Sequence, residues 1–418
     1  MKDLFPITSL FFLVLSSAHA ETVLLKSSDL PRMVKESNEL VKAGESHEKS
    51  LQTKTGHLTR SFLPEVSLHA GQESFTILSN RDYSQPFFGA SLSLNLFNGG
   101  RDLISERIFK SEFEQGKANQ LVNVAHQLEA ARKTFWEAVY LKVMIEEMAS
   151  GLKTIQANRN SALKRIKSGV ATQSDRFEFD IKESEIQQDI KKSELELSRV
   201  LGQLKIHLGM DSAVDLKITE DLDHDHNWKN FMKHSEEDHD YLLKPLELES
   251  KSFELKKNLA QLKWMPKLDA YALWLQNTQR SEYDLSSASD REQTVLGVRA
   301  IWTLSDFVSG RAQKNEMTHR LRANELQLNY QKRELENEIH MEIKELDLLD
   351  EMVHTANENI ERSTKFFKMI SEEYRRGVKT SGDMLSASEK LIDSKIRRLK
   401  IIRDFQFAKS HLMTKLGE

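Results

Sequence analysis

The chain has 418 residues, of which 60 are Lys or Arg and 64 are Asp or Glu, and it contains 16 Gly, 6 Pro and no Cys. So much charge with so little Pro and Gly is typical of long solvated helices, and it excludes a collagen, a mucin-like stalk and a proline-rich linker protein. Without Cys there is no disulfide scaffold, zinc finger or thiol nucleophile, and a formal net charge of -4 predicts no nucleic-acid partner.

The first twenty residues (1–20) have the pattern of a secretory signal peptide. Lys2 precedes an apolar stretch over residues 4–15, and Ala18-His19-Ala20 supplies the small-x-small cleavage pattern, so the mature chain should begin at Glu21. The alternative is a buried N-terminal helix. No later segment approaches the roughly 20 continuous apolar residues of a membrane-spanning helix. If the exported chain enters a membrane, we therefore expect it to do so as a β-barrel, which satisfies its own backbone.

The mature chain contains an internal duplication. One short match could arise by chance, but four in the same order predict repeats over residues 21–210 and 241–418, joined by a polar linker over 211–240. The matches pair Pro64 with Pro266, Gly100-Arg101 with Gly310-Arg311, Gly169-Val170-x-Thr172 with Gly377-Val378-x-Thr380, and Leu208-Gly209 with Leu416-Gly417.

Each repeat is expected to begin with a helix and to continue into two strands. The first helix should start near Asp29 and end before Pro64, and its counterpart should cover about 241–264, because proline disfavours a helical residue before it. Strands are then expected at about 65–97 and 267–305, where apolar residues alternate with small or polar ones. The apolar positions of the clearest runs are Phe88, Ala90, Leu92, Leu94 and Leu96, and Leu296, Val298, Ala300, Trp302 and Leu304.

This alternation gives each strand one apolar and one polar face, over the length of a tilted membrane strand. The alternative is a soluble β-sandwich packed on the helices. Four strands cannot close a barrel with a lumen, since the smallest membrane barrels need about eight. If the strands span a membrane, several chains must share one barrel. Trp274 and Trp302 would then suit the aromatic girdle of that barrel.

The helices that follow the strands are unusually long. Little interrupts a helix over residues 102–168 or over residues 312–376, and at about 1.5 Å per residue each would extend roughly 100 Å. Apolar residues recur every seven positions, as at Ile339, Leu346 and Val353, which indicates coiled-coil packing. Such heptads alone would fit a soluble rod or scaffold equally well.

Each long helix should end at a turn that leads into a last helix. Gly169 and Gly377 can adopt the left-handed backbone that ends a helix, and Thr172 and Thr380 can cap the next helix together with an Asp three residues on. A purely structural role accounts for all of these residues. The functional alternative is that the two turns are exposed tips where a partner docks.

The chain resembles the TolC family of outer-membrane efflux proteins over essentially all of the mature sequence. The resemblance is carried by the duplicated Gly-Val-x-Thr-x-x-Asp turns, the Leu-Gly repeat ends, the prolines before the strands and the Gly-Arg pairs after them. It implies a mainly α protein with membrane β, in which a long α-helical coiled-coil barrel joins a 12-stranded β-barrel shared by three chains. Such a homotrimer would sit in outer-membrane lipid and extend into the periplasm.

The resemblance also implies the function. The protein would be the passive exit duct of a tripartite efflux or type I secretion system, would have no cofactor, and would not be an enzyme. Its partners would be a periplasmic adaptor protein and an inner-membrane pump. Docking of the adaptor is carried over from the family to Gly169, Val170, Gly377 and Val378.

A periplasmic gate is carried over from the family in the same way, to Asp175, Asp383, Tyr374 and Lys379. A second acidic position of the family, three residues after Asp383, is Ser386 here, so a double carboxylate ring would be incomplete. Two Asp from each of three chains would still attract cations and repel anions at one opening. Screening within about 8 Å at physiological salt would confine that effect to the constriction.

Other chemistry has little support in the sequence. His and Asp residues over 221–240 are ligand types for zinc, copper or nickel, but their spacing fits no closed site, so a solvated linker is favoured and no metal is predicted. The sequence contains no HExxH, phosphate-binding loop, GxGxxG or GxSxG motif. The remaining alternative to a duct is a periplasmic coiled-coil adaptor or structural rod.

Overall fold

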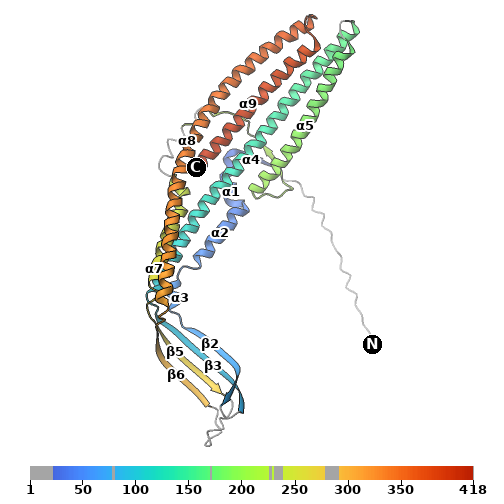
Figure 1. Cartoon of the computed structure of the whole chain (residues 1–418). Coiled ribbons are helices and arrows are strands. Elements are labelled where there is room, and N and C mark those ends of the chain that lie inside the picture. Colours follow the sequence, from blue (N-terminus) through green and yellow to red (C-terminus); the bar gives the residue numbers. More distant parts are fainter. Residues whose placement is uncertain are drawn as a thin grey trace, which may run out of the picture. The chain divides into compact units, whose positions relative to one another are not determined.

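A computed structural model describes residues 22–77, 81–169, 172–225, 228–229, 239–277 and 291–417 (Figure 1). The chain divides into two compact units. The first, called here the helical unit, holds the described residues within 22–39, 127–225 and 345–411. The second, called the strand-bearing unit, holds those within 40–126, 228–344 and 412–417. Helices α4 (Arg101–Lys167) and α8 (Asp306–Arg375) contribute residues to both units.

The other elements fall into one unit each, apart from single turns at their ends. The helical unit contains β1 (Thr22–Leu25), the short 3-10 helix η1 (Ser27–Asp29), α1 (Leu30–Ser37), α5 (Gln173–His207), β4 (Asp215–Ile218) and most of α9 (Ser381–Leu416). The strand-bearing unit contains α2 (Glu39–Gln52), α3 (His57–Ser61), β2 (Glu65–Ile77), β3 (Arg81–Phe97), η2 (His239–Leu242), α7 (Lys244–Gln261), β5 (Lys267–Asn277) and β6 (Arg291–Ile301).

In the helical unit, four helix segments form one layer in the order α8, α9, α4, α5 (Figure 1). Polar contacts join each neighbouring pair. The Ser363 and Ser394 hydroxyls lie 2.9 Å apart between α8 and α9, Lys395 of α9 lies 2.8 Å from Glu147 of α4, and Gln156 of α4 donates to Glu183 of α5 at 2.9 Å. The layer therefore has two edge helices, α5 and α8. Among the described residues, no helix is long and apolar enough to cross a membrane.

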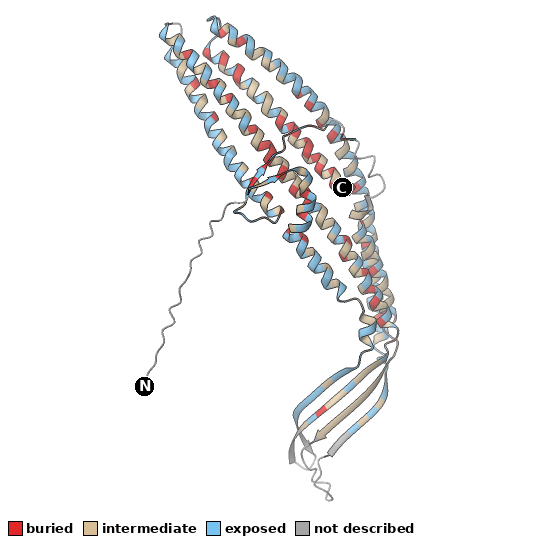
Figure 2. Ribbon diagram, turned by 180° about the vertical axis from the view of Figure 1, so that it is seen from behind, coloured by how far each residue is buried: buried red, intermediate tan, exposed pale blue. Residues whose placement is uncertain are grey.

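Apolar side chains at coiled-coil spacing hold the layer together. On α4, Ala131, Phe135 and Ala138 are completely buried, at the alternating three- and four-residue steps of a helix seam. Phe405 of α9 is also completely buried. Figure 2 shows buried positions concentrated along α9 and α4, whereas the edge helix α5 is mostly pale blue or tan. The predicted heptad row lies on α8, where Leu346 and Val353 are buried, with exposed fractions of 0% and 2%.

In the helical unit, a two-stranded parallel sheet joins the start of the first repeat to the linker that follows it. β1 pairs with β4 from Thr22 opposite Asp215 to Leu25 opposite Ile218. The sequence patterns did not predict this pair, because four-residue strands are too short to show a period. The segment after β4 packs on α9, where Gln406 donates to the Asp223 carbonyl at 2.9 Å. Part of the predicted polar linker is therefore ordered structure.

The strand-bearing unit contains a four-stranded sheet in the order β2-β3-β5-β6, and all of its pairs are antiparallel. The prediction of two hairpins at about 65–97 and 267–305 is confirmed, except that β6 ends at Ile301 and α8 already begins at Asp306. Trp302 and Leu304, predicted as strand positions, follow the strand. Because β2 and β6 lie at the two ends of this order, each leaves one backbone edge without a strand partner in the described chain.

The first predicted helix is wrong as a continuous element, because it is broken into α1, α2 and α3. Asn38 has an extended backbone (φ -61, ψ 127) and its side-chain amide donates to the His207 carbonyl at 2.8 Å. That contact satisfies an orphan carbonyl at the end of α5. The second break, over residues 53–56, ends at Gly56 with φ 82. The counterpart helix in the second repeat is confirmed as α7.

Candidate functional site: an apolar sheet face and two helical turns

One face of the four-stranded sheet is apolar and uncovered. The register places Val66, Leu92, Ala272 and Leu296 side by side in one row across all four strands. The exposed fractions of Val66 and Leu296 are 66% and 77%, and those of Leu68 and Val298 in neighbouring rows are similar. Contiguous apolar surface of this kind is rarely left in water. The face therefore requires a covering apolar phase that the described chain does not supply.

The opposite face of the sheet is more polar. Glu65, Ser93 and Tyr271 share one row, and Arg299 lies 3.7 Å from Asp269 in the next. Arg299 also lies over the Tyr271 ring, 5.5 Å from its centroid. Apolar residues appear on this face towards the loop end, at Leu273, Leu275 and Val295. The two faces thus differ as the alternation in the sequence predicts.

Exposed aromatic and aliphatic side chains gather at the end of the sheet next to the helices. Trp302 is 60% exposed and its indole nitrogen donates to the Trp264 carbonyl at 2.8 Å. The other members of this collar are Phe62, Leu63, Leu304, Phe307 and Val308. Trp274, the second predicted girdle residue, instead packs edge-on against Phe88, with ring centroids 6.0 Å apart. Amphipathic Trp rings suit a boundary between apolar and aqueous surroundings.

The two turns between long helices, both in the helical unit, are built as predicted. Gly169 and Gly377 have φ 74 and φ 83, a backbone that costs an L-residue about 1–2 kcal/mol. A Cβ at either glycine would meet nothing within 4 Å, so both tips are open. Val378 is 72% exposed, and Val170 lies outside the described residues. The candidate docking residues that can be located are therefore accessible.

Each turn is closed by the predicted capping pair. The Thr172 backbone N–H and hydroxyl donate to Asp175 at 2.7 and 3.0 Å, and those of Thr380 donate to Asp383 at 3.0 and 2.9 Å. These bonds from Thr380, with the nearby charge of Lys379, hold the pKa of Asp383 below its ordinary value. Both carboxylates thus stay ionised well below neutral pH, although each is engaged in capping its own helix.

Tyr374, the predicted aromatic gate residue, is buried, with an exposed fraction of 2%. Its hydroxyl lies 3.2 Å from the Ser381 hydroxyl at the start of α9. Burial acts to raise the pKa of Asp175, but hydrogen bonds from Thr172 and from the Ser381 side chain, with the charge of Arg165, lower it overall. Ser381 therefore connects Tyr374 to Asp175, and so links the ends of the two helical hairpins within one chain.

Sequence reasoning missed Arg165 and Ser381 in this cluster. Arg165, in the last turn of α4, places its guanidinium carbon 4.3 Å from the Tyr374 ring centroid. Basic residues are common in the last turn of a helix. The local sequence around Arg165 therefore does not indicate that it contacts a residue on α8. The structure thus brings Asp175 and Tyr374 together, while Asp383 and Lys379 remain at their own turn.

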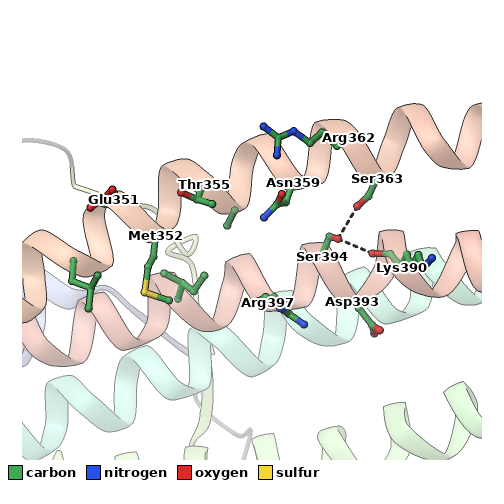
Figure 3. Close-up of a pocket in the computed structure, with 13 residues that line it drawn as sticks. Glu351, Met352, Thr355, Asn359, Arg362, Ser363, Lys390, Asp393, Ser394 and Arg397 are labelled. Atoms are coloured by element: carbon green, nitrogen blue, oxygen red, sulfur yellow. Dashed lines mark hydrogen bonds between the residues drawn. The ribbon is translucent and has the colours of Figure 1, made fainter.

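The edge helices of the layer in the helical unit carry unpaired apolar stripes. On α5, the side chains of Phe177, Ile181, Leu195 and Ile206 are 56–74% exposed, and on α8 those of Leu348, Met352 and Met369 are 40–56% exposed. Beside the α8 stripe, a groove of about 650 Å³ lies between α8 and α9. Figure 3 shows Met352, Asn359 and Arg397 among its lining residues, with the Ser363–Ser394 contact bridging the two helices.

The described part of the linker holds only some of the possible metal ligands. In the described part of the chain, no group of three or more His, Asp or Glu is placed to hold a metal ion. His224 packs on Phe405 and lies 3.1 Å from Asp350, and Asp225 pairs with Lys409. Residues 226–227 and 230–238 lie outside the described residues. His224 and Asp225 thus contact α8 and α9.

Comparison with known proteins gives a family match for the second half of the chain and a fold for nearly all of it. Residues 239–418 match the sequence profile of the family described as Outer membrane efflux protein. The outer membrane protein VceC of Vibrio cholerae is similar, with a TM-score of 0.74, 12% identity, and 94% of this chain and 96% of that chain covered. The CmeC outer membrane channel of Campylobacter jejuni is similar at a TM-score of 0.75, with 12% identity and coverage of 94% and 85%.

The open-state MtrE outer membrane channel of Neisseria gonorrhoeae is similar at a TM-score of 0.72, with 13% identity and coverage of 94% of this chain and 88% of that chain. Identities this low establish the shared fold alone. No curated protein sequence matches the chain. The fold predicted from the duplicated motifs, long helices joined to a small antiparallel sheet, is confirmed.

Proposed function

Because residues 239–418 match the outer membrane efflux protein family and nearly the whole chain shares the fold of solved outer-membrane channels, we propose that the protein acts as the passive exit duct of a tripartite efflux or type I secretion system. On this proposal it is an outer-membrane channel protein and not an enzyme, and its helices extend into the periplasm. The uncovered apolar sheet face carries the proposal. A soluble rod or adaptor would have to cover that face with its own chain.

In the proposed duct, the apolar face of the sheet contacts lipid and the more polar face contacts water. One sheet has four strands and two free edges, β2 and β6, and four strands enclose no lumen. Joining β6 of one chain to β2 of the next would remove both edges. Three chains would then give one barrel of twelve strands in the outer membrane, the number that the family resemblance implies.

The unpaired helical stripes support the same ring. A contact between two different surfaces is head-to-tail, and such contacts close into rings when the rotation allows. Phe177 lies 8 residues after Gly169, and Met369 lies 8 residues before Gly377. Leu195 and Met352 lie 26 and 25 residues from the same glycines. Members of the α5 stripe and of the α8 stripe therefore lie at nearly equal distances from their turns. The α5 stripe of one chain can thus pack against the α8 stripe of a neighbouring chain, beside the α8–α9 groove.

The turns are proposed as the contact with the rest of the export machine. Gly169, Val170, Gly377 and Val378 would meet the helical tips of a periplasmic adaptor, which connects the duct to an inner-membrane pump. Open space around both glycines and the exposure of Val378 leave room for such a contact. Passage would need no reaction, so cargo selection would rest with the pump.

The gate is proposed at the same end of each chain. Asp175 and Asp383, repeated in three chains, would place about six carboxylates around the opening, with Lys379 as a partner for acids of a neighbouring chain. Tyr374 would act within its own chain, because it is buried and bound to Ser381. Opening would then require the hairpin ends of each chain to separate.

Crosslinking tests the ring, because the chain contains no Cys of its own. In a Leu195→Cys plus Met352→Cys variant, a flexible bis-maleimide should link chains in the membrane into covalent trimers. The matched control is Leu195→Cys plus Met369→Cys, whose second Cys is 17 residues from Met352, or about 25 Å along the helix. Equal crosslinking of the two pairs, or crosslinks within single chains only, would contradict the head-to-tail ring and with it the shared duct.

A further inference from the structure

We propose that a pocket in the strand-bearing unit, next to the start of the sheet, binds the phosphate headgroup of an anionic phospholipid. The pocket has a volume of about 560 Å³ and lies among the ends of α3, α4, α7 and α8. Its lining includes the basic residues Arg101, Lys256, Lys263 and Lys267. This proposal rests on the proposed function only in that the sheet contacts lipid.

Two buried polar atoms of the pocket have no partner. One Arg101 guanidinium nitrogen, Nη2, and the side-chain carbonyl oxygen of Asn98 are both buried without a hydrogen bond. The rest of each group is engaged: Arg101 Nε donates to the Asn98 backbone carbonyl at 2.9 Å, and Asn98 Nδ2 donates to Asp102 at 2.9 Å. Burying a donor and an acceptor without hydrogen bonds costs free energy. Two such atoms in one pocket indicate that a polar ligand binds there.

The charge of the pocket selects an anion. Four basic side chains line it against two acidic ones, Asp102 and Glu316. Asp102 is occupied by hydrogen bonds from Asn95 and Asn98, at 2.8 and 2.9 Å. Lys256 is paired with Glu112 at 2.8 Å, whereas Lys263 and Lys267 have no ion pair in the described part of the chain.

The helix α4 adds to this selection. Arg101 is the first residue of α4, so the pocket also faces the positive end of a helix of 67 residues. Helix N-termini favour phosphate through their free N–H groups and dipole. An Arg donor and two Lys ammoniums suit a phosphodiester, and the Asn98 carbonyl oxygen would accept from a headgroup hydroxyl. A phosphoglycerol headgroup meets all of these requirements.

The surroundings of the pocket favour a lipid as the source of the phosphate. Lys263 is next to Trp264, which is 46% exposed and accepts the hydrogen bond from Trp302 of the apolar collar, and Lys267 is the first residue of strand β5. Leu259 and Met317 supply an apolar wall on the same pocket. Basic pockets at the boundary between apolar and aqueous surroundings are the sites where anionic headgroups bind. The headgroup would lie in the pocket, and its acyl chains would lie along the collar.

Thermal unfolding of the full-length protein in neutral detergent tests the proposal. Added phosphatidylglycerol should raise Tm by a few degrees, whereas phosphatidylcholine at the same concentration should not. The Lys263→Gln plus Lys267→Gln variant should lose this difference between the two lipids. The matched control is Lys257→Gln plus Lys314→Gln, which removes two charges from α7 and α8 outside the pocket lining.

Three outcomes would overturn the proposal. Equal stabilisation by the two lipids would exclude headgroup recognition. Equal stabilisation of the two double variants by phosphatidylglycerol would place the lipid elsewhere. Stabilisation by glycerol 3-phosphate as large as that by phosphatidylglycerol would make the ligand a free phosphate ester instead of a lipid. Crosslinking of the helical stripes does not depend on Lys263 or Lys267, so failure of this site and failure of the duct remain distinguishable.

Discussion

Arg165, near the end of α4, lies over the ring of Tyr374, near the end of α8, and donates a hydrogen bond to the Tyr374 backbone carbonyl at 3.0 Å. The Arg165 guanidinium thus hydrogen-bonds to the backbone of Tyr374 and also lies over its ring. Around them, Ile155, Phe179 and Met384 form a core cluster at the ends of the two hairpins. Arg165 therefore ties α4 to α8 at the proposed gate, and separation of the hairpins would break both of its contacts.

Replacing Arg165 with Met should ease opening of the gate. A cation–π contact with a charged hydrogen bond is worth about 1–2 kcal/mol, which shifts an equilibrium by roughly 5- to 30-fold. Single-channel recordings in planar bilayers should therefore show larger or more frequent conductance than in the wild-type protein. Lys164→Gln, which removes an exposed charge from the same turn, is the control. Unchanged recordings for Arg165→Met would mean that this contact does not restrain the gate.

A charge on the apolar sheet face should block membrane assembly. Val298 is 70% exposed and shares a row with Ala270 and Leu94. Val298→Arg would cost about 2–4 kcal/mol near the middle of a bilayer, while Ser93→Arg on the opposite face should be tolerated. The measurement is the amount of heat-modifiable trimer in outer-membrane fractions. Normal trimer levels for both variants would rule out lipid contact at this face.

Acid should weaken the contact between α4 and α9 through Glu129. Burial acts to raise the pKa of this carboxyl, but hydrogen bonds from His411 at 2.6 Å and Lys133 at 2.6 Å lower it to about 2, from 4.5. A lowered pKa means that the stabilisation is complete above pH 4.5 and is lost as pH falls towards 2. It amounts to about 3 kcal/mol at most.

The matching experiment compares Tm at pH 6 and pH 3 for the wild type and Glu129→Gln. We expect Tm of the wild type to fall further, because the variant has no carboxylate to protonate at this site. Glu361→Gln, which removes an exposed carboxylate paired with Lys365 at 2.5 Å, should behave like the wild type, since surface pairs contribute little. An acid response of Glu129→Gln equal to that of the wild type would disprove the assignment.

An acidic residue at the second turn should weaken adaptor docking without affecting the fold. Val378 is 72% exposed, so Val378→Asp removes no buried contact. If the tips dock through apolar contacts, coprecipitation with the host's periplasmic adaptor should fall at least about tenfold, because a desolvated charge costs more than 1.4 kcal/mol. Arg376→Ala, an exposed change at the same turn, is the control. Normal coprecipitation of Val378→Asp would move the docking site elsewhere.

Where the sequence has a periodic pattern, that pattern predicted the helices and strands well. Alternation over Phe88–Leu96 predicted β3, and proline before the strands predicted where the preceding helices end. The break at Asn38 had no such signal, because its cause is a hydrogen bond to a residue on α5. The β1–β4 pair was missed for the same reason, since its partners are nearly 200 residues apart in the chain.

The candidate site likewise has features that follow from the local sequence and features that depend on distant contacts. The Gly-x-x-Thr-x-x-Asp spacing predicted the left-handed glycines and the capping pairs, all of which form within one turn. The burial of Tyr374 could not be predicted, because it depends on Ser381, Arg165 and a core cluster drawn from four helices. Tyr374, which the family resemblance placed at a gate, is engaged inside its own chain.

By itself, the sequence determined the strands, the long helices, the duplicated turns and the unequal faces of the sheet, since each follows from φ preference, periodicity or capping within a few residues. Only the tertiary structure decided which of those faces stay uncovered and which side chains meet. Coverage depends on contacts between segments hundreds of residues apart. The tertiary structure leaves apolar surface exposed on the sheet, on α5 and on α8, and it forms a basic pocket around an Arg101 nitrogen that has no hydrogen bond.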